Sequence, residues 1–147
     1  MKSLFSPQAH SEIMSRLEQL DQNKQASWGK MKVGQMAWHC QGPFHIMLEK
    51  NDYGMKPSWF AKVFFKKSLY NDKPWRKNLP TAKFLKPIED KDFNTEKSKL
   101  EALINEAYSH RDKAEWKSHP AFGYFTADQW GQMQYKHLDH HFSQFGV

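Results

Sequence analysis

The sequence is poor in cysteine and contains no long apolar run. Its 147 residues include a single cysteine, Cys40, which excludes an intrachain disulfide and a cysteine-rich zinc module and is typical of a reducing compartment. No stretch approaches the roughly 20 apolar residues of a membrane span, and the N-terminal residues lack the apolar core of a signal peptide. We therefore expect a cytoplasmic protein with no membrane span, folded as one domain over residues 1–147.

The alternation of apolar and polar residues that marks half-buried strands is also scarce. Apolar residues recur instead at helical spacing in four long segments, at about 7–21, 33–50, 94–111 and 127–145. A shorter amphipathic segment at 59–69 and a proline-rich stretch at 74–87 separate the second long segment from the third. These patterns predict an all-α fold, a four-helix bundle with a long crossover between its second and third helices.

Capping residues mark the ends of the first and last predicted helices. Ser6 is a suitable N-cap, and Pro7 fits the first helical position, where the missing N–H is not needed. Thr126 and Gln129 have the spacing of a capping box, in which each side chain accepts a hydrogen bond from the other residue's backbone N–H. Gly146 is placed to end the last helix in the left-handed conformation. The sequence thus predicts where the first helix begins and where the last helix begins and ends.

Two histidines on the predicted last helix have the spacing of metal ligands. His137 and His141 are one turn and about 40° of arc apart, so their imidazoles can bind one ion, whereas His140 points toward solvent. The best third ligand is His39, which lies beside the apolar stripe of the second helix. Cys40 is a softer alternative, although its central place on that stripe favours a buried structural thiol. The spacing leaves open a metal site or hydrogen-bonded imidazoles at the edge of the core.

Motifs that would supply a nucleophile or bind a phosphate are absent. We find no serine nucleophile elbow, no glycine-rich phosphate loop and no dinucleotide fingerprint. The histidine segment also departs from the zincin motif, which places Glu directly after the first His, because here that residue is Leu138. Catalytic residues therefore stay unassigned, and any chemistry would depend on a metal ion that activates water or a thiol.

Several segments together resemble one family of helical bundles. They are the entry to the second helix, WGKM at 28–31 and QMAWHC at 35–40, the link NLPTA at 78–82, and the closing stretch 119–146 with QYKHLDHH at 134–141. These segments are similar to the DinB/YfiT-like superfamily, and in particular to a branch of unknown function. The resemblance extends from about residue 17 to residue 147 and is loose between 50 and 75.

The resemblance implies a four-helix bundle that binds a divalent metal through one histidine of the second helix and an H-x-x-x-H pair of the last. In this sequence the matching positions are His39, His137 and His141. Imidazole ligands do not decide the metal, which is Zn, Ni, Mn or Fe. The superfamily includes thiol-dependent transferases and hydrolases, so the resemblance implies transfer of a low-molecular-weight thiol to, or hydrolysis of, a small-molecule substrate. It also allows a homodimer.

The positive charge of the chain is concentrated in one segment, which we call the basic segment. Residues 56–87 contain nine of the 22 Lys and Arg residues and one acid, Asp72, a local net charge of +8. Interleaved aromatics make this mixture suitable for nucleic acid, for an anionic membrane or for attracting an acidic substrate. We favour a plainer interpretation, in which the aromatic side chains belong to the core and the lysines form a solvated face. The alternative function is a non-enzymatic binding or stress-related protein that contacts nucleic acid or an anionic partner through 56–87.

Overall fold

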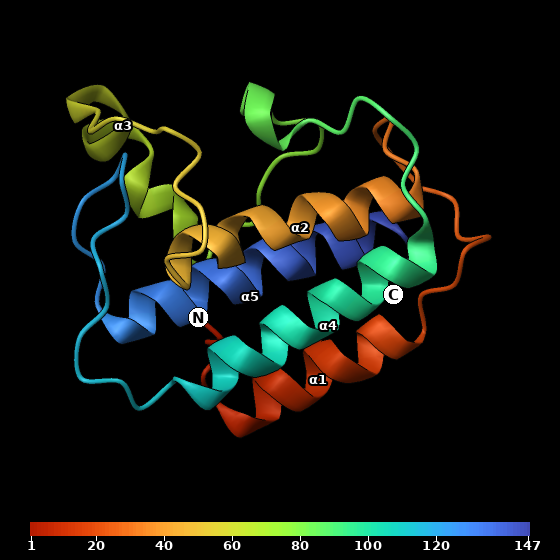
Figure 1. Ribbon diagram of the computed structural model, residues 1–147, viewed down its shortest axis with the longest axis horizontal. Helices are drawn as coiled ribbons and strands as arrows, with labels where there is room; N and C mark the ends of the chain where they lie inside the picture. Colours follow the sequence, from red (N-terminus) through yellow and green to blue (C-terminus); the bar gives the residue numbers. More distant parts are fainter.

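The fold is all-α, as the sequence predicts, in a computed structural model that describes residues 1–147. It contains no β-strand, and one isolated β-bridge pairs His119 with Gly123. Four long helices form a bundle, and three short helical elements lie in the connection between the second and third of them (Figure 1). In chain order the elements are α1 (Pro7–Glu18), α2 (Val33–Met47), α3 (Trp59–Phe64), η1 (Lys66–Leu69), η2 (Lys83–Leu85), α4 (Phe93–Ser109) and α5 (Ala127–Gln144).

Helices distant in the chain are neighbours in the bundle. Each of α1 and α2 packs against both α4 and α5. In Figure 1, α2 lies along the upper side of the bundle with α5 beside it, and α1 closes the lower side next to α4. The contact between α2 and α5 is the one that positions the site described below, because it joins the two helices that carry the predicted histidines.

Buried aromatic and aliphatic side chains hold the four helices together. The core consists of 25 buried apolar residues, and its largest fully buried side chains include Trp130, Phe44, Phe125, Phe142 and Phe145. Burying one such side chain stabilises a fold by about 1.5–3 kcal/mol. Because α2, α5 and the loop before α5 supply these residues, the packing at this interface is dense and holds the two backbones at a set distance.

The predicted helix caps are confirmed. Ser6 Oγ accepts from the Ala9 N–H at 3.3 Å, and Pro7 is the first residue of α1. The Thr126–Gln129 capping box is present in full, with both hydrogen bonds at 3.1 Å. Gly146 follows α5 with a φ of +73°, the left-handed conformation that glycine adopts without a steric penalty.

The helices are shorter than predicted at three places. The second helix ends at Met47 rather than near residue 50, because Glu49 adopts a φ of +61° that no α-helix tolerates. The first helix ends at Glu18, before a turn in which Asp21 Oδ1 accepts from the Asn23 N–H. The amphipathic segment predicted over 59–69 forms two short elements, α3 and η1, divided at Phe65. In each case a local backbone turn overrides side-chain periodicity, which is weak at helix ends.

The crossover between α2 and α4 covers the side of the bundle where α2 meets α5. It is held there by Leu85, whose side chain packs against α2 so closely that a Cβ at Gly42 would lie 2.2 Å from Leu85 Cδ2. Phe84, the residue before Leu85, stacks on Tyr53 from the start of the crossover, with ring centroids 5.0 Å apart. The crossover is therefore a packed part of the fold, and Gly42 permits its close approach.

The prediction that the aromatics of the basic segment belong to the core is wrong for α3. Four aromatic side chains in α3 and directly after it are exposed. They are Trp59, which is 73% exposed, Phe60, Phe64 and Phe65. The reason is that α3 stands off from the bundle (Figure 1), so no long helix covers its apolar face. Aromatics later in the segment, Tyr70 and Trp75 among them, are half-buried.

No helix in the fold combines the length and the apolar character that crossing a membrane requires.

Candidate metal centre

Three histidine side chains meet between α2 and α5. His39 comes from α2, and His137 and His141 come from successive turns of α5; all three are buried. One ring nitrogen from each lies within 4.8 Å of the other two. The structure thus brings together the three residues that the sequence singles out, and this histidine centre could hold a metal ion.

The distances within the histidine centre suit a shared ion. His39 Nε2 and His137 Nε2 are 3.0 Å apart. Two nitrogens bound to one tetrahedral zinc ion at roughly 2.0 Å each lie about 3.3 Å apart, so this pair has nearly the spacing that a shared ion requires. The pairwise ring centroids are 4.7–5.0 Å apart, and the ring planes are steeply inclined to one another rather than stacked.

A backbone carbonyl sets the tautomer of His39. Its Nδ1 lies 2.8 Å from the carbonyl oxygen of Leu85 in η2. A carbonyl oxygen only accepts, so Nδ1 carries the hydrogen and Nε2 of the neutral ring carries the lone pair. The crossover therefore orients His39 so that a free ligand atom faces α5.

A side-chain amide sets the tautomer of His141 in the same way. Gln144 Nε2 donates to the Trp28 carbonyl oxygen at 2.6 Å, which leaves Gln144 Oε1 to accept from His141 Nδ1 at 2.9 Å. The Nε2 of His141 consequently carries its lone pair. Gly29, with a φ of +82°, permits this contact, because a Cβ there would lie 2.7 Å from Gln144 Nε2. Partners of this kind orient ligands and raise their basicity in metal sites.

His137 differs from the other two because its Nδ1 is buried without a hydrogen-bond partner. Without an ion, the 3.0 Å contact with His39 requires the hydrogen on His137 Nε2, and the lone pair on Nδ1 is then buried and unsatisfied. A buried polar atom without a partner costs about 1–3 kcal/mol. An ion at the converging ring nitrogens would accept their lone pairs, and the Nδ1–H of His137 would then be the group without a partner. The unpaired Nδ1 is common to both states, and the convergence of the three ring nitrogens is what points to an ion.

The electrostatics keep the three imidazoles neutral. Burial lowers the pKa of each, for His141 to about 3, and the neighbouring imidazoles lower the pKa of His137 and His141 further. Neutral imidazole is the form that binds metal. No carboxylate belongs to the cluster, so a divalent ion there would keep its full positive charge.

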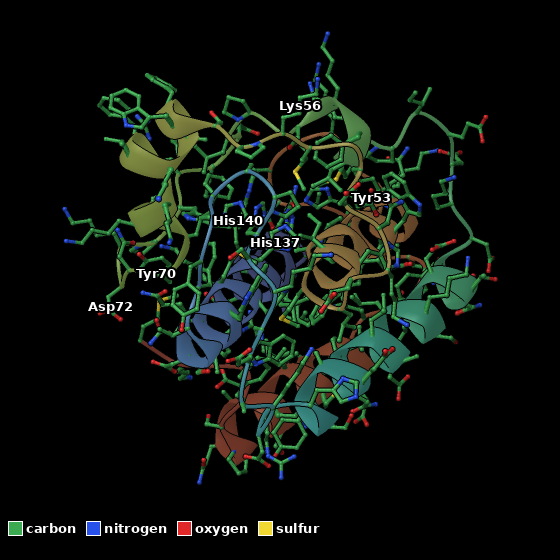
Figure 2. The ribbon with its side chains drawn as sticks, turned by 60° about the vertical axis from the view of Figure 1, so that its left-hand side comes forward. Tyr53, Lys56, Tyr70, Asp72, His137 and His140 are labelled. Carbon is green, nitrogen blue, oxygen red and sulfur yellow. The ribbon has the colours of Figure 1, made fainter.

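Aromatic side chains cover the histidine centre. Trp75 from the crossover lies edge-on to His137 and His140, with ring centroids 5.9 and 5.7 Å away. Trp28 lies edge-on to His140 at 5.9 Å, and Lys77 Nζ lies 4.5 Å from the centre of the Trp28 ring. In Figure 2, the labelled His137 and His140 lie along α5 close to its contact with α2. His140 is half-buried at the edge of the centre, where the predicted solvent-facing side begins.

Helical periodicity places Lys136 on the side of α5 opposite its apolar seam, where a solvent-facing lysine is expected, and the structure contradicts that expectation. The Lys136 side chain is buried, and its ammonium donates to Ser68 O, Asn71 O and Asn71 Oδ1 at 2.7–2.8 Å. The crossover folds over this side of α5, and Trp75 Nε1 donates to the same Ser68 carbonyl at 2.9 Å. Lys136 therefore anchors the loop that brings Trp75 to the histidine centre.

Cys40 and four further histidines lie outside the centre. Cys40 is fully buried, its thiol contacts Met36 Sδ at 3.6 Å, and burial raises its pKa. His10 pairs with Asn105 and His45 with the Tyr53 hydroxyl. His119 accepts from two backbone N–H groups of its own loop, and His110 is exposed. These side chains are structural or solvent-facing, as the absence of a partner at ligand spacing predicts.

Of the groups that orient the ligands, sequence reasoning offers only Gln144, as a residue that could orient ligands or solvent, and does not commit to it. Gln144 lies on the histidine face of the last helix, about 20° from His137, and that position was the only available signal for it. The carbonyls of Leu85 and Trp28 belong to every residue type and have no sequence signal at all.

Comparison with known proteins identifies one family. The family model described as "Protein of unknown function (DUF1569)" matches residues 3–146, nearly the whole chain, and the protein belongs to this family. No curated protein and no solved structure matches the chain. The resemblance to a branch of unknown function is consistent with this result, while the link to the DinB/YfiT-like superfamily stays a prediction.

Proposed function

We propose that this member of the DUF1569 family binds one divalent metal ion through His39, His137 and His141 and uses it to act on a small molecule. The observation that carries the proposal is the set of hydrogen bonds around the histidine centre. Leu85 O and Gln144 Oε1 each hold an imidazole in the tautomer with its lone pair on Nε2, and one ring nitrogen of each of the three histidines lies within 4.8 Å of the other two. Three neutral imidazoles that converge in this way are a typical catalytic donor set for zinc and related metals.

The reaction class in this proposal is hydrolysis or transfer of a low-molecular-weight thiol. A divalent ion held by three imidazoles supplies Lewis-acid activation of a water or thiol in its open coordination position. The chain itself orients the ligands through Leu85 and Gln144 and shields the centre with Trp75. No carboxylate lies in the cluster to act as general base, and the titratable group at its edge is His140, half-buried, with its ring centroid 5.1 Å from that of His141.

The surroundings of the centre favour a small substrate that carries negative charge. Lys77 lies over Trp28 beside His140, and Arg76 adds a second exposed cation next to Trp75 in the chain. Cations at the edge of a site attract anions and raise the rate at which they arrive. A carboxylate-bearing thiol combines that charge with a group that the metal could activate.

Metal content is the first test of this proposal. Protein purified without an affinity tag is loaded with zinc, nickel, manganese or iron, dialysed and measured by elemental analysis. We expect about one ion per chain in the wild type and loss of nearly all of it in His137→Ala and His141→Ala. His110→Ala, which removes an exposed histidine outside the centre, should retain the ion. A wild-type protein that no divalent metal loads would exclude the site.

Activity is tested separately from metal content. Loaded wild type and His137→Ala are compared in transfer of small thiols to electrophilic acceptors and in hydrolysis of small esters and amides. We expect turnover in the wild type only, and its loss on chelation with recovery on reloading. If the loaded protein shows no turnover with either class above the His137→Ala background, the metal is structural and the enzymatic part of the proposal is wrong.

A further inference from the structure

The short helix α3 has its amphipathic pattern reversed relative to the rest of the fold. Its residues Trp59, Phe60, Val63 and Phe64 fall within about 140° of arc, and all four are more than half exposed. The opposite side carries Ala61, which is half-buried. With Phe65, also exposed, these side chains form one apolar surface, which we call the α3 knob; it consists of Trp59, Phe60, Val63, Phe64 and Phe65.

Contacts with the bundle hold the α3 knob in its outward orientation. Ser58 caps α3 through its hydroxyl, and its N–H donates to the Ala121 carbonyl at 3.2 Å. Lys66 donates to the Tyr124 carbonyl, and its ammonium lies 4.7 Å from the centre of the buried Phe125 ring. Figure 2 shows the knob projecting from the bundle, with Tyr70 and Asp72 on the chain that leads back from it. The helix is thus attached by its polar and small residues, and its apolar residues are left to solvent.

The basic segment, which includes the knob, carries positive charge that is not paired with carboxylates. None of the nine basic side chains of residues 56–87 forms a salt bridge, and the single acid of the segment, Asp72, pairs with the N-terminal amine. Elsewhere, eight of the thirteen basic side chains pair with a carboxylate; they are Lys2, Arg16, Lys32, Lys50, Lys99, Arg111, Lys113 and Lys117. A partner that complements this region must therefore be anionic and must also accept apolar side chains.

We propose that the α3 knob is a docking site for an anionic lipid surface, into which its aromatic side chains insert while the lysines beside them contact lipid headgroups. Protruding Trp and Phe side chains enter the boundary between headgroups and acyl chains, and flanking lysines bind anionic headgroups. Lys62 and Lys67, both exposed, are placed for the second role.

Two other partners, nucleic acid and a second copy of this chain, fit the knob less well than a lipid surface does. Phe60 and Phe64 pack with ring centroids 4.7 Å apart, and Phe65 and Trp59 close on them at 5.8 and 6.4 Å. Rings that cover one another are not separate platforms on which nucleic-acid bases stack, and Val63 offers no ring at all. A second copy is disfavoured because a two-fold contact would bring two sets of uncompensated lysines into one interface, with no acid in either copy of the knob to pair with them.

Vesicle binding tests the proposal. The full chain is mixed with vesicles of phosphatidylcholine alone or with about one third phosphatidylserine, and bound protein is measured by co-sedimentation. We expect at least about tenfold tighter binding to the anionic vesicles and weakening as salt rises. Phe60→Ser/Phe64→Ser and Lys62→Glu/Lys67→Glu should each weaken binding about tenfold or more. The control Ile88→Ser removes an apolar side chain that is 95% exposed outside the knob and should bind as the wild type does.

Three results would overturn the proposal. The first is equal binding of the wild type to neutral and anionic vesicles, or full binding by both double variants. The second is tighter binding of single-stranded oligonucleotides than of vesicles, lost in the same variants, which would make the partner nucleic acid. The third is a dimer that the wild type forms without lipid and that the Phe60→Ser/Phe64→Ser variant does not form. Because these substitutions lie on the surface, each variant should keep the wild-type unfolding temperature and metal content, which separates this test from that of the histidine centre.

Discussion

The histidine centre and the α3 knob are opposite exceptions to the rule that apolar residues lie inside and polar residues outside. The centre buries three imidazoles between α2 and α5, and the knob exposes five large apolar side chains of residues 59–65. The centre is surrounded by polar groups that orient it, among them Gln144 and the Leu85 carbonyl. The knob has uncompensated lysines beside it instead. For each exception we propose a ligand that would stabilise it, a cation at the centre and an anionic surface at the knob.

The crossover links these two regions physically. Its residue Ser68 accepts from both Trp75 Nε1 and Lys136 Nζ at the end of η1. Trp75 covers His137, and η1 continues directly from α3. A change in how the knob is held would therefore reach the side chains that shield the histidine centre.

The largest effect that we expect is the loss of stability at acid pH that comes from His119, the buried histidine in the loop behind the knob. Burial lowers the pKa of His119 to about 4, below the unfolded value of 6.5. The unfolded chain then binds more protons than the folded one, so stability is full above pH 6.5 and falls as the pH drops toward 4. His119 contributes a loss of about 3 kcal/mol over that range.

Urea unfolding of metal-free protein at a series of pH values measures this dependence. His119→Gln should lower stability at pH 7, where it loses the acceptor for the Ala121 and Phe122 N–H groups. It should also flatten the slope by about 1.4 kcal/mol per pH unit between pH 6 and 5. The exposed His110 gives the matched control, since His110→Gln should leave the slope unchanged. Equal slopes in His119→Gln and the wild type would contradict the role assigned to burial.

The second effect concerns the hydrogen bonds that orient the ligands of the centre, which have no counterpart in the knob. Gln144→Met keeps the length of the side chain but removes the acceptor for His141 Nδ1 and the donor to Trp28. We expect zinc affinity to fall about 10- to 100-fold, because partners of this kind hold the ligand in its binding tautomer. Competition titration with a chromogenic chelator measures the affinity.

The control for this prediction is Gln132→Met on the exposed side of α5, where Gln132 bonds only to Asp128. Its zinc affinity should equal that of the wild type. If both variants bind zinc with wild-type affinity, the Gln144 amide does not orient the ligand.

The smallest effect is the stability cost of removing apolar side chains from the knob. Trp59→Ser and Phe64→Ser should change the free energy of unfolding by no more than about 0.5 kcal/mol, because these side chains are exposed. Phe142→Ala, in the fully buried core of α5, should cost about 3–5 kcal/mol. Chemical unfolding measures all three, and a knob variant as destabilised as the core variant would mean that these aromatics are packed, as the sequence interpretation held.

The candidate site could be predicted only in part from the sequence. The one-turn spacing of His137 and His141 is a local property of a helix, so their shared face follows from the sequence alone. The position of His39 in the site depends on the pairing of α2 with α5. Its place beside the apolar stripe made it only the best candidate for the third ligand. Trp75 and Leu85 had no signal, since the path of a long crossover depends on its packing and not on local propensity.

The sequence by itself determined where the long helices begin, which of their faces are apolar and which histidines share a turn, because capping and helical periodicity act between residues close in the chain. The tertiary structure alone decided that α3 turns its apolar face outward and that Lys136 is buried beneath the crossover. Both results depend on which element covers which face, a matter of packing between distant segments. The same amphipathic pattern that predicts a buried face in α5 therefore leads to an exposed one in α3, where no long helix covers it.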